Sequence, residues 1–97
     1  MTVEYHPAVQ QEVQRIRDYY NERVPGLGGD FVDEFERQVL RIAAAPKHWM
    51  VIKHDVRRSL MKRFPYIIYF REIGLDRVRI TVVKHERRHP ARGLQRK

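Results

Sequence analysis

The chain has 97 residues, of which 42% are hydrophobic and 33% are charged, and its formal net charge is +8. A chain of this length forms one domain with one core, because domains commonly contain about 100 to 150 residues. The absence of cysteine excludes a disulfide framework and a cysteine-ligated zinc site. We therefore expect a single domain over residues 1–97.

The positive charge is concentrated in the second half of the chain. Residues 1–46 contain 5 Lys or Arg against 8 Asp or Glu (−3), whereas residues 47–97 contain 15 against 4 (+11). This polarity predicts a surface for nucleic acid, a ribonucleoprotein or an acidic protein; the simpler interpretation is a solvated basic surface. The longest apolar run, Tyr66–Phe70, is far below the roughly 20 residues of a membrane span, and residues 1–6 lack signal-peptide character. We expect a soluble cytoplasmic protein without a membrane partner.

The first half of the chain predicts a strand followed by a helical hairpin. Val3 and Tyr5 alternate with polar residues, which is typical of a short strand. A helix should begin at Pro7 and end at Pro25-Gly26. Its apolar residues fall on one face: Val9, Val13, Ile16, Tyr20 and Val24.

A second helix should follow a flexible turn at Gly28-Gly29, with Asp30 as a candidate N-cap, and should stop before Pro46. Its apolar face contains Phe31, Phe35, Val39 and Ile42.

The second half predicts a loop and a three-stranded meander. Residues 47–55 are irregular, with Trp49 as the single large apolar side chain that packs on the core. Three runs have strand character: Val56–Phe64, Tyr66–Glu72 and Arg77–His85. Gly74 and Asp76 between the last two indicate an antiparallel hairpin. The resulting order β-α-α-β-β-β is an α+β fold, with the strand and long helical hairpin packed on a small antiparallel sheet.

The strands also predict which face of the sheet is covered. Tyr66–Phe70 is apolar on both parities, so it should be the central strand, buried on both faces. In the last strand Val78, Ile80 and Val82 should face the helices, and the alternate residues should face the other way: Arg79, Thr81, Val83 and His85. This arrangement leaves a mixed, basic face for a partner, and we expect residues 86–97 to be a flexible tail until bound.

Two segments carry a resemblance to a known family. The first is Arg58-Ser59-Leu60-Met61-Lys62-Arg63-Phe64-Pro65-Tyr66-Ile67-Ile68-Tyr69, and the second is Ile80-Thr81-Val82-Val83-Lys84-His85-Glu86-Arg87-Arg88-His89-Pro90. An arginine-led strand, an aromatic-rich strand and a last strand running into H-x-R-R-x-P resemble the ParE/RelE superfamily of type II toxin–antitoxin toxins, which include plasmid stabilisation proteins. The resemblance covers nearly the whole chain, including the order of its elements.

The resemblance implies one of two activities. RelE-like members are ribosome-dependent endoribonucleases that cut messenger RNA, whereas ParE-like members inhibit DNA gyrase. Two features favour the ParE-like branch: the long hairpin over residues 7–45, and the absence of a tyrosine after Tyr69, since RelE-like nucleases often carry a functional one near the C-terminus. ParE-like proteins often have a tryptophan soon after the R-R-x-P step, where this chain has Arg92-Gly93-Leu94.

The resemblance also implies partners. We expect a cognate antitoxin with an acidic, amphipathic segment, DNA gyrase as the target, and operator DNA bound only through the antitoxin. The ribosome and messenger RNA are the alternative target, and a non-toxic repressor subunit is a third possibility.

We expect the target to bind basic residues of the second half: Arg58, Lys62, Arg79, His85, Arg87, Arg88 and Arg92. For the nuclease alternative, metal-free cleavage needs a general acid or base and cations beside the phosphate. His85, Arg58 and Arg88 would supply these, with His85 on the same face as Arg79. The alternative is that His85 only ends a strand and the arginines pair with antitoxin carboxylates.

Other sites have weaker support. The five histidines lack the spacing of a helical metal site, and the glycines after the first helix lack the lysine of a phosphate-binding loop, so we expect no metal and no cofactor. A row of aromatic side chains beside Arg63 and Arg71 is a candidate stacking platform for single-stranded nucleic acid, although core packing is the simpler interpretation. The row consists of Phe64, Tyr66, Tyr69 and Phe70.

Overall fold

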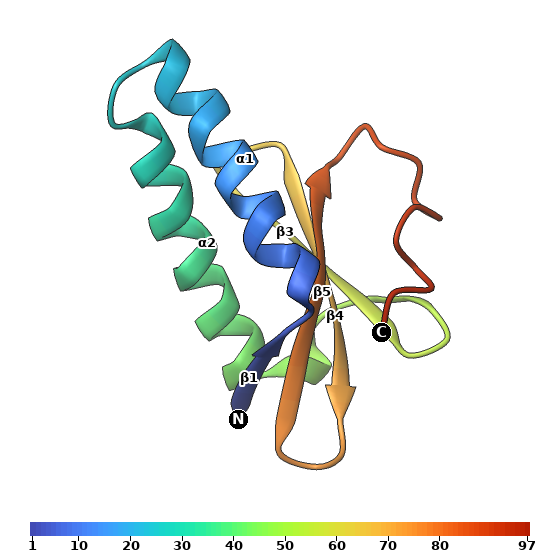
Figure 1. Cartoon of the computed structure of the whole chain (residues 1–97). Helices are drawn as coiled ribbons and strands as arrows, with labels where there is room; N and C mark the ends of the chain where they lie inside the picture. Colours follow the sequence, from blue (N-terminus) through green and yellow to red (C-terminus); the bar gives the residue numbers. More distant parts are fainter.

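A helical hairpin packs on one face of a five-stranded sheet in the computed structural model, which describes all 97 residues (Figure 1). The elements are β1 (Thr2–Tyr5), α1 (Pro7–Arg23), α2 (Leu27–Ala44), the 3-10 turn η1 (Pro46–His48), β2 (Val51–Lys53), β3 (Val56–Leu60), β4 (Tyr66–Ile73) and β5 (Arg77–His85). The sheet order is β1-β5-β4-β3-β2, with β1 parallel to β5 and the other pairs antiparallel. The predicted α+β fold is confirmed, with the short strand β2 added inside the predicted loop.

The two helices meet closely at Gly28. Its N–H, one of the unpaired donors of the first turn of α2, donates to Asn21 Oδ1 of α1 at 2.8 Å. A Cβ atom at Gly28 would lie 2.2 Å from the Arg17 carbonyl oxygen. The predicted turn at Gly28-Gly29 and the N-cap at Asp30 are therefore wrong, because α2 already begins at Leu27. The absence of a side chain at Gly28 instead allows the two helices to come into close contact.

The main core lies between the hairpin and the sheet. Val9 and Ile16 of α1 are buried there, as predicted, whereas Val24 at the end of the stripe is exposed. The buried residues of α2 and the sheet in this core are Phe31, Phe35, Val39, Ile42, Ala43, Ile68, Phe70, Val78, Ile80 and Val83. Trp49 packs against it, as the sequence indicates.

A buried carboxylate ends β3 earlier than predicted. Glu34 Oε2 of α2 accepts the backbone N–H groups of Lys62 and Arg63 at 2.9 and 3.1 Å. These donors are thereby withdrawn from strand pairing, and Met61 and Phe64 on either side of them are buried in the core. The strand consequently stops at Leu60 and not at Phe64.

A β-bulge at Thr81 changes the faces of β5. Tyr69 pairs with Val82 but the next residue, Phe70, pairs with Ile80, so Thr81 is the extra residue. Beyond the bulge Val83 enters the main core, and Val82 points to the opposite face. The predicted alternation therefore holds through Ile80 and is wrong after it, because it assumed an unbroken period of two.

The opposite face of the sheet carries a second, smaller cluster and the C-terminal segment. The cluster consists of Val56, Ile67, Tyr69 and Val82, with Ile52 and Leu94 packed against it. Residues 86–97, which we call the tail, run along the side of the sheet away from the helices (Figure 1). This face is therefore covered by the chain itself, contrary to the expectation that it is left for a partner, and β4 is buried on both faces as predicted.

Candidate target-binding surface

Many basic side chains of the second half are neutralised inside the fold. Glu4 of β1 pairs with Arg77 at 2.7 Å and with Arg79 at 2.9 Å. These arginines, Arg79 first, hold the pKa of Glu4 below its ordinary value. Arg96 of the tail pairs with Glu12 of α1 at 2.8 Å. Of the predicted target-binding residues, Arg79 is therefore already engaged by a carboxylate.

Lys84 anchors the tail on the second face. Its Nζ donates to the carbonyl oxygens of His89 and Arg92 at 2.9 and 2.8 Å, and it lies 4.2 Å from the ring centroid of Tyr69. Burial, with the nearby Arg92, lowers the pKa of Lys84. The Tyr69 hydroxyl donates to the Pro90 carbonyl oxygen at 2.7 Å. Lys84 thus satisfies tail carbonyls, a role that its sequence position does not indicate.

Arg58 and Arg92 belong to this second face. Arg58 lies opposite Tyr69 in the β3–β4 register, and its charge acts on the Tyr69 hydroxyl, whose pKa burial raises. Arg92 is exposed in the tail beside Lys84. Lys62 stands apart from both, exposed in the connection between β3 and β4.

His85, Arg87 and Arg88 gather on the other side, around a hollow between the end of β5 and α1. The hollow has a volume of about 670 Å³, and its lining includes Tyr19, Tyr20, Arg23, Tyr66, His85, Arg87 and Arg88. The His85 ring meets the Tyr66 ring edge-on, with centroids 5.2 Å apart. Burial raises the pKa of both Tyr20 and Tyr66. We call this site the arginine–tyrosine pocket.

The nuclease trio is not brought together by the fold. His85 and Arg88 line the arginine–tyrosine pocket, whereas Arg58 lies on the opposite face of the sheet with Tyr69. His85 Nδ1 also accepts the Arg87 backbone N–H at 3.1 Å. Because the bulge at Thr81 turns His85 away from Arg79, the expected sharing of one face by these two residues is wrong.

The aromatic row is mostly core. Phe64, Tyr69 and Phe70 are buried, and only Tyr66 is partly exposed, at the pocket. The simpler interpretation therefore holds for three of the four, since a buried ring has no free face for a base. No three His, Asp or Glu side chains converge as a metal would require, and neither helix is both long and apolar enough to span a bilayer.

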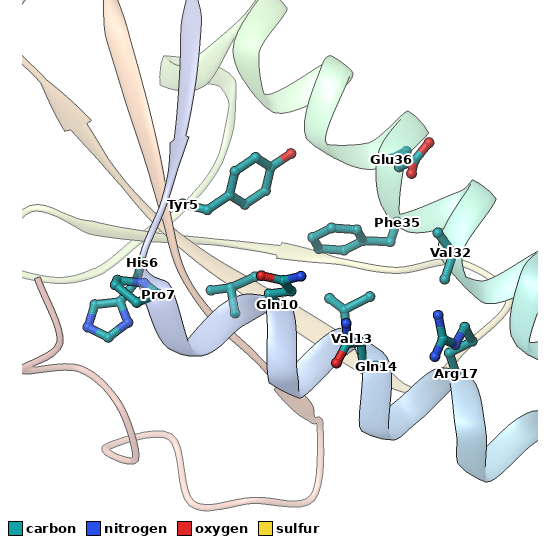
Figure 2. A pocket seen from close by; sticks show the side chains of 11 residues that line it. Tyr5, His6, Pro7, Gln10, Val13, Gln14, Arg17, Val32, Phe35 and Glu36 are labelled. Atoms are coloured by element: carbon teal, nitrogen blue, oxygen red, sulfur yellow. The ribbon is translucent and has the colours of Figure 1, made fainter.

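An apolar groove opens on the helical hairpin next to β1 (Figure 2). It has a volume of about 440 Å³, and its apolar side chains come from Tyr5, Val9, Val13, Val32 and Phe35. The Tyr5 ring points toward α2, where Phe35 and Glu36 lie, and is about half exposed (Figure 2). Burial and the Glu36 charge raise the pKa of its hydroxyl.

The family model for the ParE toxin of the type II toxin–antitoxin system parDE matches residues 3–90. This chain belongs to the ParE toxin family. The resemblance seen in the sequence is confirmed, and membership implies a cognate antitoxin as the partner of this toxin.

A solved structure supports the fold of the toxin. The structure described as the chromosomal ParDE TA system from P. aeruginosa is similar to it with a TM-score of 0.77 and 18% sequence identity, over 88% of this chain and 95% of that one. No curated protein matches the toxin in sequence. At this identity the likeness shows the shared fold.

Tyr19 and Arg23 of the arginine–tyrosine pocket were not among the predicted site residues. Arg23 of α1 stacks on the Tyr19 ring, with its guanidinium carbon 3.6 Å from the ring centroid. The signal in the sequence is an arginine four residues after a tyrosine on the polar side of a helix, which places the two side chains together. The sequence gives no indication that this pair meets the end of the last strand.

Proposed function

We propose that this toxin inhibits DNA gyrase by direct binding, through the basic side chains at the end of β5 and in the tail, until its antitoxin covers them. The proposal rests on the exposure and the lack of ion pairs of three arginines, Arg87, Arg88 and Arg92. All three are exposed and none forms an ion pair within the chain, in contrast to Arg77, Arg79 and Arg96. Gyrase as the target comes from the ParE-like resemblance, which the two long helices of the hairpin favour.

Unpaired arginines at one end of a domain suit recognition of an acidic or nucleic-acid-bound target. An exposed guanidinium keeps its donors free for carboxylate or phosphate oxygens. Arg58 and Lys62 add to the positive field near this end of the sheet, while Arg79 contributes less because Glu4 neutralises it.

We also propose that the antitoxin uses the apolar groove on the hairpin. The apolar side of an amphipathic segment would cover Tyr5, Val13 and Phe35, removing them from water. Acidic residues of the same segment would reach the unpaired arginines, so that one partner would neutralise the toxin.

A supercoiling assay with purified gyrase, ATP and this toxin tests the target. We expect inhibition that added antitoxin reverses. The double variant Arg87→Ala/Arg88→Ala should need at least about tenfold more protein for the same inhibition, since two charge-assisted contacts are lost. The matched control is Arg15→Ala/Arg37→Ala, because these exposed helix arginines also lack ion pairs and carry the same charge.

Other results of the supercoiling assay would contradict either the proposed surface or the proposed target. Equal loss in both double variants would contradict the proposed surface and indicate a dependence on net charge alone. No inhibition by the unmodified toxin at several-fold excess over gyrase would contradict the target itself. New messenger 5′ ends at A-site codons on translating ribosomes would then establish the nuclease alternative.

A further inference from the structure

The arginine–tyrosine pocket concentrates positive charge that no acidic side chain of the protein neutralises. Arg23, Arg87 and Arg88 line it, and no carboxylate is among its lining residues. None of the three forms an ion pair, although Glu4, Glu12 and Glu72 pair with arginines or lysines elsewhere. A hollow lined by three arginines and no acidic side chain has a positive potential that would attract an anion from outside the chain.

The three arginines come from distant parts of the sequence. Arg23 lies in the last turn of α1, and Arg87 and Arg88 follow β5. The bulge at Thr81 brings them together, because it turns His85, and with it the start of the tail, toward the helices. The Arg87 N–H bond to His85 Nδ1 and the Arg88 N–H bond to the His85 carbonyl oxygen then fix this turn at 3.1 and 3.0 Å.

The wall of the pocket is aromatic. Tyr19 is about half exposed and carries Arg23 over its ring, while Tyr20 and Tyr66 line the interior beside it. Its volume of about 670 Å³ falls within the range of roughly 300 to 1,000 Å³ of sites for small organic ligands, so it has room for more than a bare anion. Guanidinium groups beside aromatic rings are the combination with which proteins bind single-stranded nucleic acid.

We propose that the arginine–tyrosine pocket binds single-stranded nucleic acid, with a phosphate held by Arg23, Arg87 and Arg88 and a neighbouring base against the Tyr19 side of the pocket. The toxin then contacts nucleic acid itself, without the antitoxin. A double helix fits this pocket less well, because its bases are stacked on one another and offer no free face to a tyrosine. This inference goes beyond the proposed function, since it requires no contact with gyrase.

Fluorescence anisotropy of a labelled twelve-residue oligothymidylate with the toxin alone tests the proposal. The variant is Arg23→Gln/Arg88→Gln, and the matched control is Arg15→Gln/Arg37→Gln, which removes the same charge from α1 and α2 outside the pocket. We expect at least a tenfold weaker binding for the pocket variant and less than a twofold change for the control. Each phosphate contact adds about 0.7 to the slope of log K against log salt, so the slope should fall by at least about that amount in the pocket variant alone.

Three further measurements separate the contribution of the phosphate from that of the base. Tyr19→Ala should weaken oligothymidylate binding about fivefold or more, the loss typical of one stacked base. A duplex of the same length should bind the unmodified toxin more weakly than the single strand. Thymidine 5′-monophosphate should displace the label at high concentration if the pocket takes a nucleotide, and inorganic phosphate should do so less effectively.

The outcomes that overturn the proposal differ from those that concern gyrase. Equal weakening by the two double variants would show that the oligonucleotide is attracted diffusely to a basic protein. This result would contradict binding in the pocket. Tighter binding of the duplex, or unchanged binding by Tyr19→Ala, would contradict the proposed contact between a base and Tyr19. Since gyrase is absent from this experiment, a toxin that binds the oligonucleotide but spares gyrase contradicts the proposed function and leaves this inference intact.

Discussion

Gly93 of the tail faces the Val82 side chain so closely that a Cβ atom on Gly93 would lie 2.6 Å from Val82 Cγ2. Gly93 also has a φ of +86°, in the left-handed region that side chains disfavour. Leu94, the next residue, packs on the second cluster of the sheet. The tail can therefore pack on the sheet in this way only with glycine at residue 93.

We expect Gly93→Ala to release the tail without unfolding the core. The added methyl group conflicts with both the backbone conformation and Val82, at a cost of about 1 to 3 kcal/mol to the docked state. Limited trypsin digestion should then cut after Arg92 and Arg96 faster than in the unmodified toxin. The control is Gly29→Ala, where an added Cβ meets nothing within 4 Å, and unchanged digestion of both variants would contradict the requirement.

Gly28→Ala should destabilise the whole domain. Its Cβ would lie 2.2 Å from the Arg17 carbonyl oxygen, a backbone atom that can retreat only if α1 and α2 separate. We expect a loss of at least about 1 to 3 kcal/mol in the free energy of unfolding, measured by urea denaturation. Gly29→Ala in the same helix should raise stability by up to about 1 kcal/mol, because alanine is the better helix former. Equal effects would show that the helices are not in close contact.

Glu34 should tolerate glutamine better than alanine. Its carboxylate is buried and accepts the N–H groups of Lys62 and Arg63, which Glu34→Ala would leave without a partner. An unsatisfied buried donor costs about 1 to 3 kcal/mol, so alanine should lower the free energy of unfolding by at least that amount. Glutamine keeps an acceptor oxygen and should lose less. A thermal denaturation series of the three proteins checks the order, and an equal loss for both variants would contradict it.

The Glu4 pairs should make the link between β1 and β5 sensitive to acid. The pKa of Glu4 in the folded chain is lowered, mainly by its hydrogen bonds to Arg79 and Arg77, from an ordinary value of 4.5. A carboxyl group with a lowered folded pKa stabilises the fold above the unfolded pKa and loses this contribution as pH falls through the folded pKa. The unmodified toxin should therefore lose more stability between pH 6 and pH 3 than Glu4→Gln, as followed by circular dichroism at roughly those limits. Parallel pH profiles would show that these partly exposed pairs contribute nothing.

Local patterns predicted most of the fold. The apolar stripe with Val9 and Ile16, and the apolar face of α2 from Phe31 to Ile42, follow the helical period and are buried as expected. The two-sided apolar run of β4 correctly predicted a strand covered on both faces. These features could be read because burial of one face imposes its own period on the sequence.

Three features of the tertiary structure decide where the predicted site residues lie: one β-bulge and two contacts between distant segments. The bulge at Thr81 has no mark of its own in the sequence, yet it moved His85 away from Arg79 and to the pocket with Arg23. Glu34 closed β3 from a position 28 residues before Lys62. Glu4 neutralised Arg79 across the β1–β5 pair, which removed one predicted site residue from the free surface.

The sequence by itself determined the family, the α+β order of the elements and the concentration of positive charge after residue 46. Each of these follows from composition, from residue spacing within an element, or from motifs whose residues are close together in the sequence. Only the tertiary structure decided which arginines stay unpaired and that the tail covers the second face of the sheet. The physical reason is that pairing and coverage depend on distances between residues far apart in the chain, and a single residue added to the β5 ladder at Thr81 changes the face of every side chain after it.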